Sequence, residues 1–136
     1  MSDSVRADED IRILILIVDD HRLVRDGIRA VISQETDMRI VGEAANGVEA
    51  LDAARTTKPD VILMDVLMPV MDGMEATVLI RKELPSARIL MLSHYDDEQH
   101  KERAIVAGAS GFLGKDMIVR DLRSAIRTVA GGGLYF

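Results

Sequence analysis

The chain alternates short aliphatic runs with longer amphipathic stretches. The strongest run, Arg12 to Val18, is continuously apolar after its first residue and ends at two acids, which is typical of a strand buried on both faces of a parallel sheet. Runs at 61–64 and 89–92 have the same character. Weaker strands are predicted at 39–41, at an edge of the sheet, and at 111–113. We therefore expect five strands.

The stretches between the runs carry apolar residues at helical spacing. A first helix is predicted over 24–32, and a second from the stripe of Val48, Leu51 and Ala54. Fainter patterns cover 74–84 and 98–107. The clearest stripe belongs to the last segment and consists of Ile118, Leu122, Ala125, Ile126 and Val129. A glycine run follows it and is expected to end this helix.

Strand and helix thus alternate five times, without internal repeats. Such alternation demands a parallel sheet with helices on both faces, because each right-handed crossover is long enough for a helix. At 136 residues the chain has the size of one compact domain. We therefore expect a doubly wound α/β domain over 12–136, preceded by a flexible acidic tail over 1–11.

The charge and composition of the chain limit its partners. Lys and Arg number 17 against 23 Asp and Glu, a formal net charge of −6, half of which falls in residues 1–10. This balance argues against direct nucleic-acid binding by the domain. The chain has no Cys, and its first apolar run is too short and too acidic in its flanks for a secretion signal or a membrane span. We therefore expect a cytoplasmic protein that does not bind a membrane.

Polar residues able to carry chemistry follow four of the apolar runs. They are Asp19, Asp20, Asp65, Ser93 and Lys115. Because open parallel sheets bind ligands beyond the carboxyl ends of their strands, we expect these side chains to converge there. Three neighbouring carboxylates repel unless they are neutralised, and a hard divalent ion with oxygen ligands is the usual solution. Singly, acids and serines at these positions more often cap helices or stand in solvated turns, and a lone Lys is more often a solvated charge. Their joint placement at one end of consecutive strands predicts a Mg²⁺ site.

A carboxylate beside Mg²⁺ can also attack phosphorus and form an aspartyl phosphate. Asp65 is the candidate nucleophile because it is the lone acid of its strand end, which leaves Asp19 and Asp20 to hold the metal. Lys115 would offset charge on the phosphoryl oxygens, and Ser93 would donate a hydrogen bond to one of them.

Several motifs carry a resemblance to a known family. They are Val18-Asp-Asp-His21, Met64-Asp-Val-Leu-Met-Pro-Val-Met-Asp-Gly73, Ser93 and Gly108-Ala-Ser-Gly-Phe-Leu-Gly-Lys115. In combination they resemble the receiver domain of two-component response regulators. Residues 23–27, 96–98 and 134–136 are similar to the NarL/FixJ (LuxR-type) subfamily. The resemblance implies a flavodoxin-like (βα)5 fold with strand order 2-1-3-4-5.

The resemblance implies an acceptor and a metal site. Asp65 would be the phosphoacceptor and a metal ligand. Asp20 would bind Mg²⁺ directly, with Mn²⁺ as an alternative ion, and Asp19 mainly through water. The backbone carbonyl of Leu67 would complete the protein ligands.

The resemblance also implies a switch and its partners. Lys115 would pair with the phosphoryl group, Ser93 would swing toward it, and Phe112 would turn inward behind Ser93. The phosphodonor would be a phosphohistidine on a sensor histidine kinase, or a small molecule. The signal would emerge on the face made by the fourth helix, the fifth strand and the fifth helix, which the family uses for homodimerisation or contact with an effector domain. The domain would modify itself rather than act as a multi-turnover enzyme.

Two other functions remain open. A haloacid-dehalogenase-type phosphohydrolase also uses an Asp nucleophile, but it needs a second Asp two positions later, where this chain has Leu67. A receiver-like interaction module that is never phosphorylated would keep the same pocket residues. In the NarL-type branch the glycine run leads into a linker and a DNA-binding helix-turn-helix domain. We expect that domain to be absent from this chain, which ends at Phe136.

The entrance to Asp65 departs from the usual family pattern. Leu67 is apolar where polar side chains are frequent, and His94 and Tyr95 follow Ser93 where a small residue is often found. We expect the bulk of these side chains to hinder an attacking water and to prolong the phosphorylated state.

Overall fold

The computed structural model describes residues 12–94 and 98–136. One parallel sheet contains β1 (Ile13–Val18), β2 (Met38–Ala44), β3 (Val61–Asp65), β4 (Arg88–Ser93) and β5 (Gly111–Gly114). The strand order is β2-β1-β3-β4-β5. The predicted doubly wound fold, its strand order and the edge position of β2 are therefore confirmed. The tail expected over 1–11 and the predicted role of Tyr95 lie outside the described residues.

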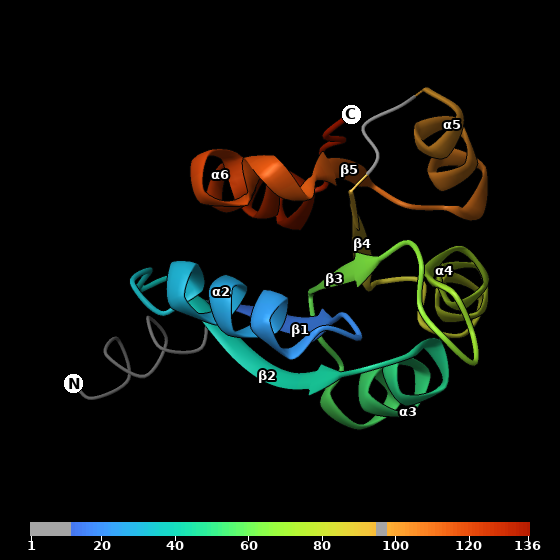
Figure 1. The fold of residues 1–136 in the computed structure, drawn as a ribbon. Helices are drawn as coiled ribbons and strands as arrows, with labels where there is room; N and C mark the ends of the chain where they lie inside the picture. The colour runs from blue at the N-terminus through green and yellow to red at the C-terminus, as the bar shows by residue number, and fades with distance from the viewer. Residues whose placement is uncertain (1–11, 95–97) are drawn as a thin grey trace.

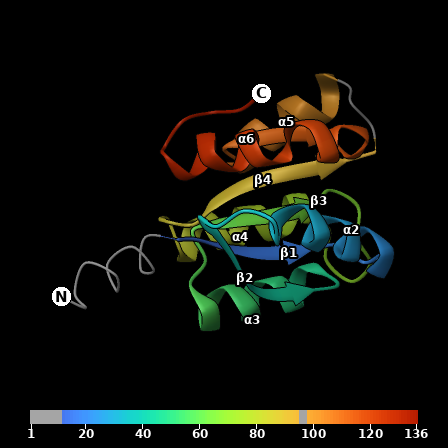
Figure 2. The ribbon, with the colours of Figure 1, turned by 90° about the vertical axis from the view of Figure 1, so that its left-hand side faces the viewer.

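The helices form two layers around this sheet. They are α2 (Arg22–Ile32), α3 (Gly47–Thr57), α4 (Gly73–Glu83), α5 (Glu98–Ala107) and α6 (Ile118–Ala130), with a short 3-10 helix, η1 (Lys115–Met117), before α6. Figure 1 shows α2 and α6 on one face of the sheet and α3, α4 and α5 on the other, and the turned view in Figure 2 has α2 and α6 in front. Within residues 12–94 and 98–136, no helix has the length and apolarity needed to cross a membrane.

The core lies on both sides of the sheet because the inner strands are continuously apolar between their ends. In β1, Ile15 and Ile17 pack with α2 and α6, whereas Leu16 and Val18 pack in the cluster under α3, α4 and α5. All four side chains are fully buried. Alternate residues point to opposite faces of a strand, so a continuous aliphatic run is what a sheet covered on both faces requires.

Helix α3 approaches the loop that follows β3 through small residues. Its buried residues are Gly47, Ala50 and Ala54, whereas Val48 is 43% exposed, so the expectation that Val48 belongs to the apolar face was wrong. The amide of Gly47 donates to the carbonyl of Met71 at 3.0 Å, and a β-carbon at Gly47 would lie only 2.6 Å from that oxygen. Close backbone contact therefore requires glycine at position 47, and the hydrogen bond ties the loop to the start of α3.

The end of the chain covers the outer edge of β5. The amide of Tyr135 donates to the carbonyl of Ser110 at 2.9 Å, and the amide of Phe112 donates to the carbonyl of Tyr135 at 2.8 Å. A parallel bridge between Gly111 and Tyr135 results. The strand that carries Phe112 is thus bonded on both sides, to β4 and to the C-terminal segment.

Candidate functional site

The carboxyl ends of β1, β3 and β5 bring three charged side chains into contact. Nζ of Lys115 lies 2.6 Å from Oδ2 of Asp19 and 3.1 Å from Oδ1 of Asp65. The side chains are 6%, 0% and 5% exposed, respectively. Lys115 starts two strands away from Asp65, and its long stem spans the end of β4 to reach both acids. The predicted convergence of these residues is therefore observed.

Burial and neighbouring charge make Asp65 a weak acid for a carboxyl group. Burial is the largest cause that raises its pKa to about 6, and the charge of Asp19 raises it further. Lys115 acts in the opposite direction through its charge and its contact, and Asp20 adds a smaller increase. At neutral pH the group is mostly ionised, although burial and the charge of Asp19 make the ionised form less favourable than in water. A cation that entered the pocket would favour the ionised form.

Asp20 and His21 extend this cluster toward solvent. One ligand atom from each of Asp19, Asp20, His21 and Asp65 can be chosen so that all lie within 4.8 Å of one another. Oδ1 of Asp20 is buried and accepts no hydrogen bond, although the side chain as a whole is 28% exposed. Nδ1 of His21 lies 3.1 Å from this oxygen without hydrogen-bond alignment. An unpaired buried oxygen among three carboxylates fits a hard divalent cation, so the donor set is suited to Mg²⁺.

The loop after β3 folds back tightly over the strand end. The amide of Val66 donates to the carbonyl of Leu92 at 3.1 Å, and the amide of Gly73 donates to the carbonyl of Val66 at 2.8 Å. A β-carbon at Gly73 would overlap the carbonyl oxygen of Asp65. Leu67 stands at the start of this loop with 57% of its surface exposed. Glycine at position 73 is thus required for the loop to close beside Asp65.

Ser93 and Phe112 lie on neighbouring strands behind the charged cluster. Ser93 ends β4, is 2% exposed and is paired in register with Gly114. Phe112 is paired with Met91 and is 4% exposed, inside the core cluster on the α3, α4 and α5 side. The Phe112 side chain is therefore already buried in this structure. The inward turn that we expect on phosphorylation would start from this buried position.

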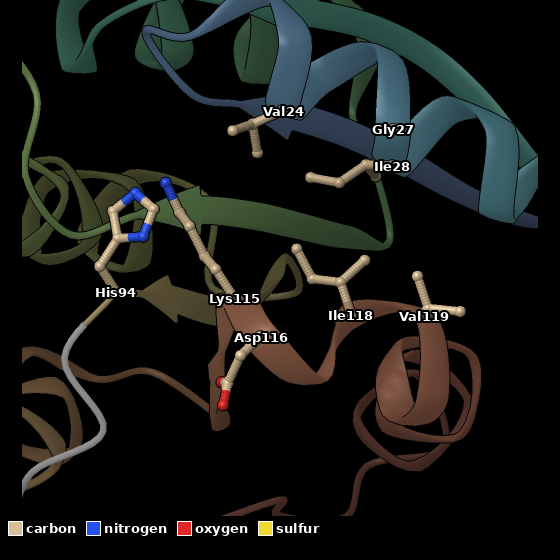
Figure 3. A pocket seen from close by; sticks show the side chains of 8 residues that line it. All are labelled: Val24, Gly27, Ile28, His94, Lys115, Asp116, Ile118 and Val119. Atoms are coloured by element: carbon tan, nitrogen blue, oxygen red, sulfur yellow. The ribbon is translucent and has the colours of Figure 1, made fainter.

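A hollow of about 440 Å³ opens beside the cluster, between α2 and the start of α6. Figure 3 shows the Lys115 ammonium and the His94 ring on the same side of this hollow, whereas Asp116 points the opposite way. His94 is exposed.

Comparison with known proteins decides the family. Residues 15–127 match the model of the response regulator receiver domain. The chain belongs to this family. The matched span of the receiver domain contains every site residue that the sequence predicted, from Asp19 to Lys115.

Relatives place the receiver domain near the LuxR-type regulators. It is 42% identical over 124 residues to the response regulator protein VraR of Staphylococcus aureus, covering 91% of this chain and 59% of that protein. A LuxR-family two-component response regulator from Aurantimonas superposes with a TM-score of 0.88 at 35% identity, covering 92% of this chain and 89% of the other. The receiver domain of the Mycobacterium tuberculosis response regulator NarL gives 0.77 at 34% identity, covering 85% and 97%. The chain spans less than two thirds of VraR.

Two features of this receiver's pocket were not predicted. The sequence assigned no role to His21, although its amide donates to Oδ1 of Asp19 at 2.8 Å and its ring faces two carboxylates. Its position directly after Asp19 and Asp20 was the available signal. The contact of Lys115 with Asp19 was also missed, because the lysine was assigned only to a phosphoryl group.

Proposed function

We propose that this receiver domain accepts a phosphoryl group on Asp65 from a phosphohistidine of a sensor histidine kinase or from a small phosphodonor. A carboxylate oxygen of Asp65 bonds to phosphorus as the bond from phosphorus to the imidazole nitrogen breaks, and the imidazole keeps the electron pair. The buried contact of Asp65 with Lys115, at 3.1 Å, carries the proposal. The same ammonium is positioned to offset charge on the transferred group.

The proposed metal ligands are Asp19, Asp20, Asp65 and the backbone carbonyl of Leu67. When bound, Mg²⁺ or alternatively Mn²⁺ offsets negative charge on the phosphoryl oxygens. The all-oxygen donor set and the unpaired Oδ1 of Asp20 support this assignment. Asp19 also receives the Lys115 ammonium and the His21 amide, so its carboxylate is held in place before any ion arrives.

Phosphorylation of Asp65 would be read by Ser93 and Phe112. Ser93 would hydrogen-bond the phosphoryl group, and Phe112 would adjust behind it, altering the face formed by α5, β5 and α6. Three observations support this route: Ser93 and Phe112 lie on adjacent strands, both are buried, and α5 and α6 both pack against β5. This face would serve homodimerisation or contact with an effector domain.

The partners follow from the family. We propose a cytoplasmic response regulator whose longer form controls transcription through a DNA-binding domain, since relatives are named as LuxR-family regulators. The receiver itself would bind no DNA, in keeping with the net charge of −6. It would gain and lose its phosphoryl group by its own chemistry and turn over no separate substrate.

Intact mass spectrometry tests this function. Wild type, Asp65→Asn and the surface control Asp26→Asn are incubated with acetyl phosphate and Mg²⁺, with EDTA as a further control. We expect one added phosphoryl group on wild type and Asp26→Asn, and none on Asp65→Asn or with EDTA. An unmodified wild type would favour an inert module, and steady hydrolysis of phosphate esters would favour a phosphohydrolase. Either result overturns the proposal.

A further inference from the structure

Arg25 connects the acidic pocket to the edge strand β2. Its side chain leaves the first turn of α2 and is 17% exposed. Nη1 donates to the backbone carbonyl of Asp19 at 2.6 Å, and Nε donates to Oε1 of Glu43 at 2.9 Å. Because a guanidinium is planar and rigid, it holds its two acceptors at a set angle. One side chain thus fixes the Asp19 carbonyl relative to β2.

The carbonyl that Arg25 holds belongs to the peptide unit that joins Asp19 to Asp20. The preceding peptide unit is held as well, because the amide of Asp19 donates to the carbonyl of Ala44 at 3.0 Å. Oδ1 of Asp20, by contrast, has no hydrogen bond. The ring of His21 approaches this oxygen with Nδ1 at 3.1 Å, without hydrogen-bond alignment. The planar peptide therefore links the position of the Asp19 carbonyl to the placement of Asp20.

We propose that Arg25, anchored by Glu43, is a positioning residue for the metal site. By holding the Asp19–Asp20 peptide it presets the Asp20 carboxylate for a divalent cation, without touching the cation or the reacting atoms. The inference rests on the proposed function, because it needs the metal at Asp20. Groups that orient metal ligands commonly matter in this way, and their loss weakens metal binding by about 10- to 100-fold.

Charge and positioning make opposite predictions for the loss of Arg25. Removing a positive charge beside three carboxylates should strengthen cation binding by Coulomb's law. Loss of positioning should weaken it. The sign of the change in Mg²⁺ affinity therefore separates the two effects.

Arg29 offers a matched control for the charge effect. It lies one turn further along α2, and its Nε donates to Oε2 of the same Glu43 at 2.9 Å. The Asp19 carbonyl takes its side-chain hydrogen bond from Arg25. Arg29 and then Arg25 hold the pKa of Glu43 below its usual value, so Glu43 is a charged anchor for both.

The test is a Mg²⁺ titration without phosphodonor, in which the NMR chemical shifts of the backbone amides report binding. We expect the Kd to rise about tenfold in Arg25→Met, to stay equal or fall in Arg29→Met, and to rise by less in Glu43→Gln. Arg25→Lys should recover part of the affinity, because an ammonium reaches one of the two acceptors. Circular dichroism checks each fold. If Arg25→Met does not fold, Arg25→Lys carries the test, because it keeps the charge and any rise in its Kd reports lost positioning.

A second measurement follows phosphorylation at increasing Mg²⁺. Positioning predicts that the rate of Arg25→Met reaches the wild-type rate once Mg²⁺ saturates. A deficit that persists at saturation, or an unchanged or lower Kd in Arg25→Met, overturns the role of Arg25 while leaving Asp65 as phosphoacceptor. A wild type that binds no Mg²⁺ overturns the inference together with the proposed metal site. A wild type that binds Mg²⁺ but is not phosphorylated on Asp65 overturns only the proposed function.

Discussion

Replacing Asp65 by Asn should make the metal-free domain more stable at neutral pH. Ionisation of this buried carboxyl is opposed first by burial and then by the charge of Asp19, and Lys115 offsets only part of that cost. Asn has nearly the same shape and stays neutral. The substitution therefore removes the cost of ionisation without opening a cavity.

The size and the sign of the effect follow from the pKa. An acid with a higher pKa in the folded state loses stability as the pH rises from the unfolded value to the folded one. For Asp65 these values are 3.8 and about 6, so the penalty is absent in acid and complete above the folded value. A shift of about two units corresponds to about 3 kcal/mol. Asp65→Asn should gain up to that amount at neutral and alkaline pH.

Urea unfolding in EDTA, at several pH values, measures this difference. Circular dichroism is the suitable signal because the chain has no Trp. Asp26→Asn, with a side chain 57% exposed, controls for the loss of one surface charge. A variant that is no more stable than wild type at neutral pH, or a gain that does not shrink in acid, would refute the reasoning. Added Mg²⁺ should reverse the order at about 1,000 times its Kd for wild type, where it stabilises wild type by about 4.1 kcal/mol.

Three further substitutions test the loop beside Asp65. Val70→Asn should raise the free energy of unfolding by about 1 kcal/mol, because Val70 is β-branched at a φ of 71° and Asn tolerates this conformation. An unchanged urea midpoint would show that the conformation carries no strain. Gly73→Ala should lower the free energy of unfolding by about 3 kcal/mol or more, because the added β-carbon would overlap the Asp65 carbonyl. A Tm equal to that of wild type would contradict the close packing. Leu67→Asn should shorten the lifetime of the phosphorylated form, measured by intact mass over time, because we expect the side chain of Leu67, 57% exposed, to hinder an attacking water. Equal lifetimes would rule out that role.

The fold was predictable because burial on both faces of a sheet leaves a plain signature. A strand such as β1 has no position that faces solvent at its carboxyl end, so Leu16, Ile17 and Val18 are all apolar and the first polar residue marks the strand end. Parallel strands then bring their ends to one edge. The meeting of Asp19, Asp65 and Lys115 follows from that rule, although Asp19 and Lys115 are 96 positions apart.

Contacts between layers were not predictable by the same rule. Val48 fits a helical stripe, yet α3 buries Gly47, Ala50 and Ala54 instead, and at Gly47 close contact with Met71 leaves no room for a side chain. The pairing of Arg25 with Glu43 depends on how α2 crosses the edge of the sheet, which periodicity along the chain does not determine. The spacing of apolar residues along the chain indicates which face of an element is buried, whereas these contacts depend on the distances between elements.

The charge of the pocket explains why the same residues are costly in one state and useful in another. Asp19, Asp20 and Asp65 together carry three negative charges when ionised, and Lys115 supplies one positive charge. Without an ion, the remaining excess of negative charge adds to burial in raising the pKa of Asp65. A divalent cation carries the charge that would balance it. Lys115 alone therefore leaves two of the three negative charges unbalanced, and a divalent cation would supply the two positive charges that are missing.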